Sequence, residues 1–299
     1  MLIRKISTFI KALYGVIIRI RYSFYNYRYY SLPSENKGPD SVTVSLTSYG
    51  RRVKSTLPFV LISLPRQTRK PDRIVVWLDH SWNNNNLPKN LIVFKNNGVV
   101  FRFCEDYKSF KKLIPSLQEY PNDIIITCDD DLFYNKHMVE RLLDAHKKHP
   151  NTICCQLAHG INYNGKKLQS YNQWEEEVFD THENVFPLGG SGCLYKAEYL
   201  YKDVVNYELA SRLTPKADDV WFYFMGVLNG TKRYVLPHIK DIVIPLDVFY
   251  QFFNRGSSLM DDNLAQGLND KQIKAIMDYY SIDIKIMCGY ENYSNNSVL

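Results

Sequence analysis

The sequence predicts an α/β fold built on one predominantly parallel sheet with helices on both faces. Over the first half of the chain, short apolar stretches rich in Val and Ile alternate with stretches of helical periodicity. Several of the apolar stretches run directly into polar or acidic residues, and parallel sheets bind ligands at the carboxyl ends of their strands. At 299 residues, with 45% hydrophobic and 23% charged residues, the chain could form one large α/β domain or two small ones.

Four strands and three helices account for the first half of this domain. The predicted strands cover residues 42–46, 73–79, 98–105 and 123–128, and the predicted helices cover residues 53–64, 108–120 and 136–149. The second half is less regular. It contains a strand at 151–160, an aromatic and acid-rich stretch at 160–185, a glycine-rich loop entering a strand at 186–196, an aromatic helix within 214–230 and an extended segment at 234–246.

The first 30 residues form a basic amphipathic arm. The apolar residues of its helical stripe are spaced by three and four: Ile3, Ile6, Ile10, Leu13, Ile17, Ile20, Phe24 and Tyr27. The uncharged runs are too short to cross a bilayer, and no cleavage site follows. The arm could lie on an anionic membrane surface, or pack on its own domain or on a second subunit. A linker is expected at residues 31–40, a single domain at 41–291 and a frayed tail at 292–299.

The net charge of +6 belongs entirely to this arm, which carries six of the 37 basic residues and no acid before Glu35. The remaining 31 basic residues balance the 31 acidic residues, which argues against a nucleic-acid-binding body and favours the membrane for the arm. The six cysteines form no C-x-x-C pair and lie mostly in apolar runs, so we expect reduced, structural thiols in a cytosolic protein.

Three consecutive carboxylates, Asp129, Asp130 and Asp131, follow the buried strand at 123–128. Three like charges at a strand end need full hydration or a divalent cation. Helix capping would need only one Asp. A calcium loop fails because Phe133 and Tyr134 stand where it needs a ligand and a glycine. A D-x-D phosphatase remains an alternative, although Phe133 stands where that class has Thr or Val.

A nucleotide-sugar site explains more of the chain. The diphosphate leaving group needs a hard cation on carboxylate oxygens, and the acceptor hydroxyl needs a base on the opposite side of the sugar. A second acidic turn, Asp218 and Asp219, precedes the aromatic helix and is the natural source of that base. A non-catalytic carbohydrate-binding module would have no use for both acidic sites.

Six blocks of this sequence resemble, in order, the bacterial GT-A glycosyltransferases of capsule and surface-polysaccharide clusters, which are related to glycosyltransferase family 2. These blocks are VSLTSYGRR, LISLPRQTRKPDRIVVWLD, DYKSFKKLIP, DIIITCDDDLFY, PLGGSGCLYK and KADDVWF, and the resemblance covers about residues 42–270. It implies a GT-A-like, Rossmann-like mixed sheet and an inverting, metal-dependent transfer from a nucleotide-sugar, with a UDP-sugar as the expected donor. The implied acceptor is a glycan or lipid-linked glycan at the inner face of the plasma membrane.

The resemblance also implies roles for particular residues. The donor is expected on Thr47, Ser48, Tyr49, Arg51, Arg52, Asp79, Lys112, Asp129 and Asp130, and Mn²⁺ or Mg²⁺ on Asp129 and Asp131 with His238 as a later ligand. The acceptor is expected at Gly189, Gly190, Ser191, Gly192 and Trp174. Asp219 is the expected base and Asp218 its supporting neighbour, although the family has Glu-Asp here, so the two roles stay open.

Bland alternatives exist for several of these residues. Lys111 and Lys112 could each lie on the solvated face of a helix, which is the commoner place for a lysine. The glycines could serve only a tight turn. A histidine such as His238 is more commonly a surface or core residue whose hydrogen bonds are satisfied than a metal ligand.

Overall fold

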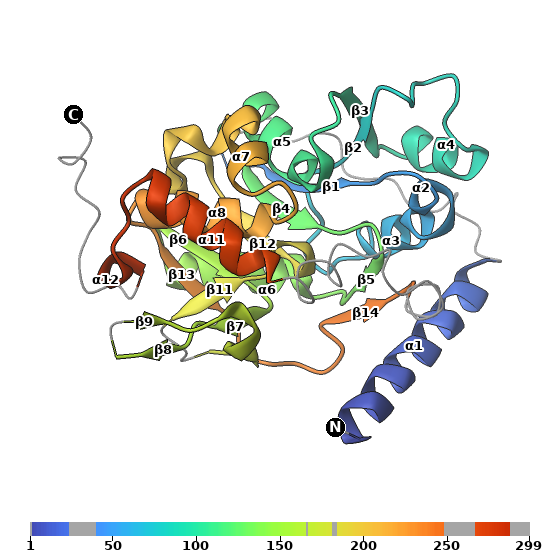
Figure 1. Ribbon diagram of the computed structural model, residues 1–299. Coiled ribbons are helices and arrows are strands. Elements are labelled where there is room, and N and C mark those ends of the chain that lie inside the picture. Colours follow the sequence, from blue (N-terminus) through green and yellow to red (C-terminus); the bar gives the residue numbers. More distant parts are fainter. Residues whose placement is uncertain (1, 24–39, 166, 181–183, 248–266, 288–299) are drawn as a thin grey trace.

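The computed structural model describes residues 2–23, 40–165, 167–180, 184–247 and 267–287 (Figure 1). Nearly all of the expected linker at 31–40 and the whole of the expected tail at 292–299 lie outside these ranges. The described part of the chain is built around one seven-stranded sheet, with smaller sheets along one side.

The central sheet has the strand order β13-β6-β12-β4-β1-β2-β3. Its strands are β1 (Val42–Thr47), β2 (Arg73–Asp79), β3 (Val100–Cys104), β4 (Ile124–Cys128), β6 (Thr152–Cys155), β12 (Cys193–Tyr195) and β13 (Lys232–Val235). All neighbours are parallel except β12, which runs antiparallel to both β4 and β6. This is the predicted mostly parallel GT-A arrangement, with one reversed strand in its middle.

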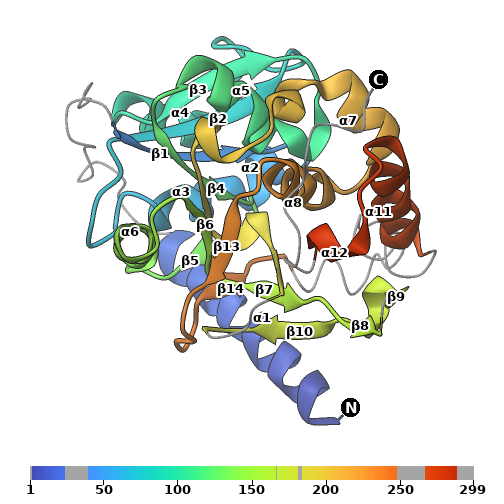
Figure 2. The same cartoon turned by 90° about the vertical axis from the view of Figure 1, so that its left-hand side faces the viewer.

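Helices cover both faces of this sheet, as the sequence predicts, because its central strands are apolar on both sides. On one face lie α2 (Arg52–Ser55), α3 (Leu57–Ser63), α4 (Lys89–Asn96) and α6 (Met138–Lys148). On the other lie α5 (Ile114–Glu119), α7 (Tyr207–Leu213), α8 (Asp218–Leu228) and α11 (Leu268–Tyr279), followed in the chain by α12 (Ile284–Met287) (Figure 2). Successive residues of β4 alternate between the two cores, with Ile125 in one and Ile126 in the other.

Two predicted helices are broken in the structure. Residues 53–64 divide into α2 and α3 at Thr56, and residues 108–120 divide into the 3₁₀ turn η2 (Lys108–Lys112) and α5 at Leu113. In both cases a proline, Pro58 or Pro115, stands at the start of the second helix. Proline has no amide hydrogen to continue the preceding helix but is well suited to a first turn.

The predicted strand at 151–160 is also two elements. After β6 the chain leaves the central sheet, and β7 (Ala158–Gly160) pairs with β10 (Glu175–Val178) and β11 (Val185–Pro187) in a small antiparallel sheet. The aromatic and acid-rich stretch supplies β10, the hairpin of β8 (Tyr163–Asn164) and β9 (Lys167–Leu168), and the 3₁₀ turn η3 (Tyr171–Gln173). Three further 3₁₀ turns are η4 (Gly189–Ser191), η5 (Ala197–Tyr199) and η6 (Lys202–Val205).

A second small sheet ties a late segment of the chain to the acidic triplet. Strand β5 (Leu132–Tyr134), directly after the triplet, pairs antiparallel with β14 (Val243–Pro245). The ladder continues for one more bond, in which the Leu246 amide donates to the Asp131 carbonyl at 2.8 Å. Residues 246 and 247 are thereby held beside the carboxyl end of β4.

The N-terminal helix α1 (Leu2–Ser23) packs against β14 (Figure 1). One of its faces therefore packs on its own domain, which is one of the alternatives expected from the sequence. Its buried residues are Ala12, Gly15, Ile18 and Tyr22. Gly15 lies directly on the Pro245 carbonyl, where a Cβ atom would collide with the oxygen. Tyr22 stacks on Phe133 at 5.5 Å.

The middle of the predicted apolar stripe lies on a different face of α1 and is exposed, whereas the side chains of Ile3, Ile6, Phe24 and Tyr27 of that stripe lie outside what the structure describes. Ile10, Leu13, Ile17 and Ile20 each keep between 48% and 59% of their surface accessible. No helix in the described ranges is long and apolar enough to pass through a membrane. The helix therefore has one face that packs on the domain, where Ala12 and Gly15 allow a close approach, and a second, apolar face on the surface.

Candidate functional site

The acidic triplet divides its three side chains among three directions. Asp129, of which 37% is exposed, accepts a hydrogen bond from Lys112 Nζ at 2.5 Å. Asp130 is 4% exposed and points inward. It accepts from Ser48 Oγ at 2.5 Å and from Arg52 Nη1 at 3.0 Å. Asp131 faces Arg52 Nη2 at 2.9 Å. The inward carboxylate thus fixes the loop after β1, while its two neighbours face the site.

Negative charge exceeds positive charge at Asp131. Burial raises the pKa of Asp131 to about 7, and the nearby charges of Asp130, Asp129 and Asp247 add to that effect while Arg52 opposes it. Burial also raises the pKa of Asp130, against the influence of Arg52 and Ser48. One arginine does not neutralise these carboxylates, and a further cation would be stabilised among them.

A single lysine, Lys112, contacts both acidic turns. Lys112 Nζ, which contacts Asp129, also lies 3.3 Å from Asp218 Oδ2 at the start of α8. Burial alone would lower the pKa of Lys112, but Asp129, Asp218 and Asp219 outweigh it and raise that pKa well above its usual value. Two carboxylate sites almost 90 residues apart in the chain therefore share a single buried ammonium group.

Asp219 lies beside Asp218 and has a different environment. Its Oδ1 accepts a hydrogen bond from the Gly189 amide at 3.1 Å. Burial raises the pKa of Asp219 to about 7; the charge of Asp218 adds to this, and Lys112 opposes it. A carboxylate with a pKa near neutrality is suited to accept a proton during a reaction.

The turn η4 brings the backbone against both acidic sites. A Cβ atom on Gly189 would lie 2.8 Å from Asp219 Oδ1, and one on Gly190 would overlap the carboxylate of Asp129. Gly192 has φ = 104°, a backbone conformation that residues other than glycine rarely adopt. The glycines are therefore needed for contact with two carboxylates as well as for the turn. Their role toward an acceptor stays a prediction, as does that of Ser191.

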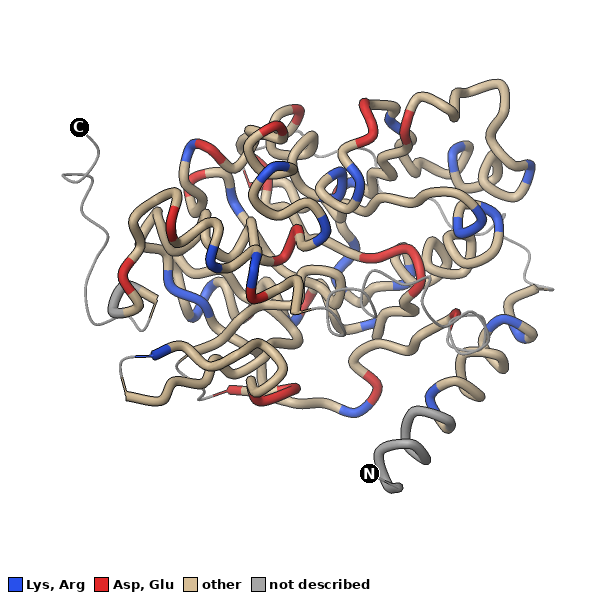
Figure 3. The backbone as a smooth tube through the Cα atoms, in the orientation of Figure 1, with Lys and Arg blue, Asp and Glu red and all other residues tan. Residues whose placement is uncertain are grey.

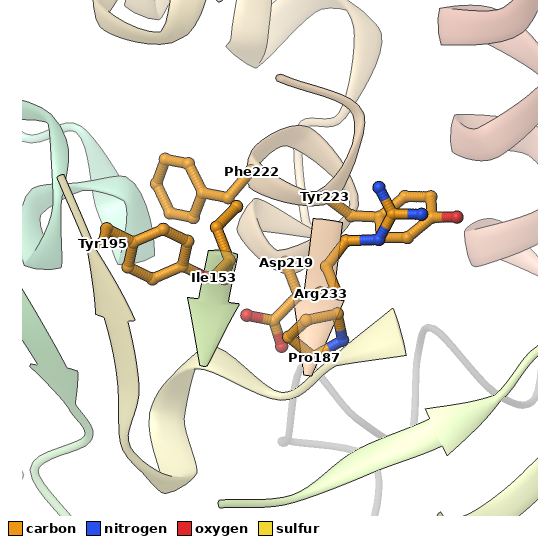
Figure 4. Close-up of a pocket in the computed structure, with 7 residues that line it drawn as sticks. All are labelled: Ile153, Pro187, Tyr195, Asp219, Phe222, Tyr223 and Arg233. Carbon is orange, nitrogen blue, oxygen red and sulfur yellow. The ribbon is translucent and has the colours of Figure 1, made fainter. Parts of the chain in front are cut away.

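Mostly apolar and aromatic side chains surround Asp219 in a tightly packed recess. The recess is lined by Ile153, Pro187, Tyr195, Asp219, Phe222, Tyr223 and Arg233. Figure 4 shows Asp219 beside Pro187, with the Arg233 side chain lying along the Tyr223 ring. The Arg233 guanidinium is 5.0 Å from the centre of that ring. One acidic side chain thus lies against an aromatic wall, and this packing accounts for the burial of Asp219.

The expected nucleotide end is more open. Tyr49 is 52% exposed and its ring lies 5.8 Å from the Arg52 guanidinium. Thr47 Oγ1 donates to the Trp77 carbonyl at 2.9 Å, so this hydroxyl holds β1 to β2. Asp79 ends β2 and accepts from the Ser81 amide at 2.9 Å. Tyr49 is thus the side chain of this group with the most free surface.

Lys111 and Lys112 do not lie on a solvated helix face, so the alternative that they are ordinary surface lysines is wrong. Lys111 and Lys112 lie in the turn η2 and are 1% and 5% exposed. Lys111 Nζ pairs with Asp106 at 2.5 Å, and Lys112 pairs as described above. Both side chains point inward, and the ammonium group of each pairs with a carboxylate.

Two predicted residues do not join the site. Trp174 is 5% exposed and belongs to the hydrophobic core, where it packs edge-on against Phe186 at 5.4 Å. A ring buried in this way offers no open face to an acceptor sugar. His238 is exposed and packs edge-on against Phe179 at 4.8 Å. Within the described ranges, no three His, Cys, Asp or Glu side chains converge as a ready metal cage.

The sequence reading missed Asp247. This residue is 3% exposed, pairs with Arg51, and lies 4.0 Å from Arg52 Nε. A signal was present, because Asp247 ends an extended apolar segment just as Asp79 ends β2. The pairing of β14 with β5, which no local pattern reveals, brings it to the triplet.

Comparison with known proteins supplies a family. A model described as glycosyl transferase family 2 matches residues 43–205, more than half of the chain. No curated protein matches. The mannosyltransferase PcManGT from Pyrobaculum calidifontis, solved with GDP-Man and Mn²⁺, is 13% identical over 92% of this chain and 84% of that one, with a TM-score of 0.45.

Structures of TarS from S. aureus are similar to the same degree. The fragment 1–349 is 13% identical over 80% of this chain and 72% of that one, with a TM-score of 0.47. Its complex with UDP is 15% identical over 81% and 72%, with a TM-score of 0.44. The family assignment rests on the match to the family model and not on these structures.

The shared lysine generates a prediction. Lys112→Met should lower the free energy of unfolding at pH 7 by about 3 kcal/mol, the lower end of the range for a broken buried pair, because Asp129 is partly exposed. Without Lys112, the pKa of Asp219, which burial and Asp218 already raise to about 7, would rise further, so the loss should shrink as the pH falls toward 5. Urea unfolding at both pH values measures this.

Lys111→Met is the matched control, because Lys111 is equally buried but pairs with Asp106, which is 43% exposed, whereas Lys112 pairs with Asp218, which is 11% exposed, as well as with Asp129. Equal losses for the two variants at pH 7, or a loss for Lys112→Met that does not change with pH, would contradict the pairing.

Proposed function

The chain belongs to glycosyl transferase family 2 and is a glycosyltransferase that uses a nucleotide-sugar donor, and from this premise we propose an inverting, cation-dependent transfer to a glycan acceptor in capsule or surface-polysaccharide synthesis. One observation carries the mechanism. The carboxylates after β4 and those at the start of α8 meet around Lys112, with Gly189 and Gly190 between them. The D-x-D phosphatase alternative is set aside, because the family match includes the triplet.

The donor would lie across the carboxyl ends of β1, β2 and β4. Tyr49 offers an exposed ring for the base, and Asp79 and Asp129 offer acceptors for base and ribose hydroxyls. Lys112, Arg51 and Arg52 supply positive charge on the side where the diphosphate would leave. A UDP-sugar is the donor class that we expect.

The residues present fit a hard divalent cation. Asp129 and Asp131 offer carboxylate oxygens, the ligands preferred by Mn²⁺ and Mg²⁺. Burial, together with the charges of Asp130, Asp129 and Asp247, raises the pKa of Asp131, and a bound cation would oppose this effect. When bound, such a cation neutralises the charge that develops on the departing diphosphate.

Asp219 is the proposed base. Its Oδ1 is occupied by the Gly189 amide, which leaves Oδ2 to take the proton of the acceptor hydroxyl. Asp218 is the proposed positioning residue, because it pairs with Lys112 and adds negative charge that raises the pKa of Asp219. These two residues lie beyond the segment that the family model matches, so the assignment rests on their contacts.

A pH profile tests the base. Because the carboxyl of Asp219 has a pKa of about 7 and must be ionised to accept a proton, turnover should rise between about pH 6 and 8. Asp219→Asn should retain nucleotide binding, lower kcat by roughly 10² to 10⁴, and remove that rise. Steady-state transfer to a soluble acceptor at saturating donor measures all three.

Asp218→Asn is the matched control and should lose less activity. If Asp219→Asn is nearly normal while Asp218→Asn is inactive, the two roles are exchanged. If both variants keep the wild-type pH profile, neither residue is the base.

The exposed face of α1 supports the proposal of a membrane-associated enzyme. Ile10, Leu13, Ile17 and Ile20 form an exposed apolar stripe, and Figure 3 shows basic but no acidic residues along the described part of this helix. A helix of this kind lies in the plane of an anionic membrane surface. We place the enzyme at the inner face of the plasma membrane, with a lipid-linked glycan as acceptor.

Substitution of the stripe tests this placement. Replacement of Ile10, Leu13, Ile17 and Ile20 by Gln should weaken binding to anionic vesicles by at least about tenfold, because apolar area no longer enters the lipid. Thermal unfolding should not change, since the buried face of α1 is intact. Vesicle co-sedimentation of the full chain is the measurement.

Ile92→Gln, at another exposed apolar side chain, is the control and should bind vesicles like the wild type. Unchanged binding by the fourfold variant would reject the lipid surface. Dissociation of a dimer by that variant would assign the stripe to a second copy of the chain.

A further inference from the structure

Asp247 is a buried carboxylate with no role in the proposed transfer. It follows β14 directly, and the bond from the Leu246 amide to the Asp131 carbonyl, 2.8 Å, holds it beside the acidic triplet. Only 3% of its surface is exposed. Both carboxylates lie beside the same guanidinium group, that of Arg52, at 2.9 Å for Asp131 and 4.0 Å for Asp247.

The two oxygens of Asp247 differ in their contacts. Oδ2 pairs with Arg51 and lies 4.0 Å from Arg52 Nε. Oδ1 is buried and has no hydrogen-bond partner among the residues that the structure describes. A buried carboxylate oxygen without a partner costs free energy, so this position favours a ligand that supplies positive charge.

Arg52 is the cation through which these carboxylates are connected. Its Nη1 is 3.0 Å from Asp130, its Nη2 is 2.9 Å from Asp131, and its Nε is 4.0 Å from Asp247. One guanidinium thus serves three acids. Asp130 also accepts a hydrogen bond from Ser48.

We propose that Asp247 and Asp131 are joint ligands of the divalent cation, and that Arg52 competes with the cation for both. This inference rests on the cation dependence proposed above. Both residues offer carboxylate oxygen, as a hard cation requires, and β14 supplies the second ligand from a part of the chain more than 110 residues away. The alternative is that Asp247 only pairs with Arg51.

The arrangement has a consequence for the donor. With a cation on Asp131 and Asp247, Arg52 would keep Asp130 but lose Asp131, and Arg51 would lose Asp247. Arg51 and Nη2 of Arg52 could then contact the diphosphate, which arginine binds through paired hydrogen bonds. Cation and donor would therefore bind with positive cooperativity.

Titration of the full chain with Mn²⁺ alone tests the proposal, with free Mn²⁺ followed by its electron paramagnetic resonance signal. Asp247→Asn should weaken Mn²⁺ binding by at least about tenfold, and Asp131→Asn should do so by a similar factor. The double variant should lose less than the product of the two factors, because both residues would serve one ion.

Asp123→Asn is the matched control. Asp123 pairs with Arg73 at the amino end of β4, about 17 Å along the same strand from the triplet, so its loss should leave Mn²⁺ affinity unchanged. Wild-type affinity in a folded Asp247→Asn variant would overturn the inference and leave Asp247 as an arginine partner. Absence of Mn²⁺ binding in the wild type would instead reject the cation dependence itself.

If Asp247→Asn does not fold, Asp247→Glu decides the question. The longer side chain keeps the charge for Arg51 but moves the ligating oxygens, so the ratio of Ca²⁺ to Mn²⁺ affinity should change by at least about threefold. A ratio equal to that of the wild type would overturn the proposal.

Discussion

The buried ammonium group of Lys112 is the contact on which the site depends. It holds the carboxylate that ends β4 and the carboxylate that starts α8, 2.5 Å and 3.3 Å away. Removal of either partner would leave charge in a buried place, so the three groups are stable only together. Both acidic turns therefore have fixed positions relative to each other, although about a third of the domain lies between them in sequence.

The reversed strand β12 explains how the backbone can enter this arrangement. Because β12 runs antiparallel to β4, the turn that precedes it lies over the carboxyl end of β4. The Gly190 carbonyl accepts from the Asp129 amide at 3.2 Å, and the Gly189 amide donates to Asp219. Side chains in this turn would separate the two acidic sites. Two adjacent glycines, followed by a third at φ = 104°, permit the close approach.

The sequence predicted the parts of the molecule that depend on local pattern. The strands β1 and β2 begin where the runs of Val and Ile begin, and the acidic turns lie at the ends of elements. The burial of Trp174 and Lys112 was harder to predict, because it depends on the partners that the tertiary structure provides. Trp174 is buried in the hydrophobic core, and Lys112 is buried against the carboxylates of Asp129 and Asp218. Asp247 reaches the triplet only through the pairing of β14 with β5, across more than 100 residues, and sequence periodicity carries no information about such pairing.

The anomeric configuration of the product tests the central claim most directly. If Asp219 deprotonates the acceptor on the side of the sugar opposite the diphosphate, a single displacement follows and the configuration at the anomeric carbon is inverted. Proton NMR of the product, recorded early in the reaction with a donor of known configuration, should show the opposite anomer. A product with the donor's own configuration would contradict a one-step transfer and remove the need for a base at Asp219.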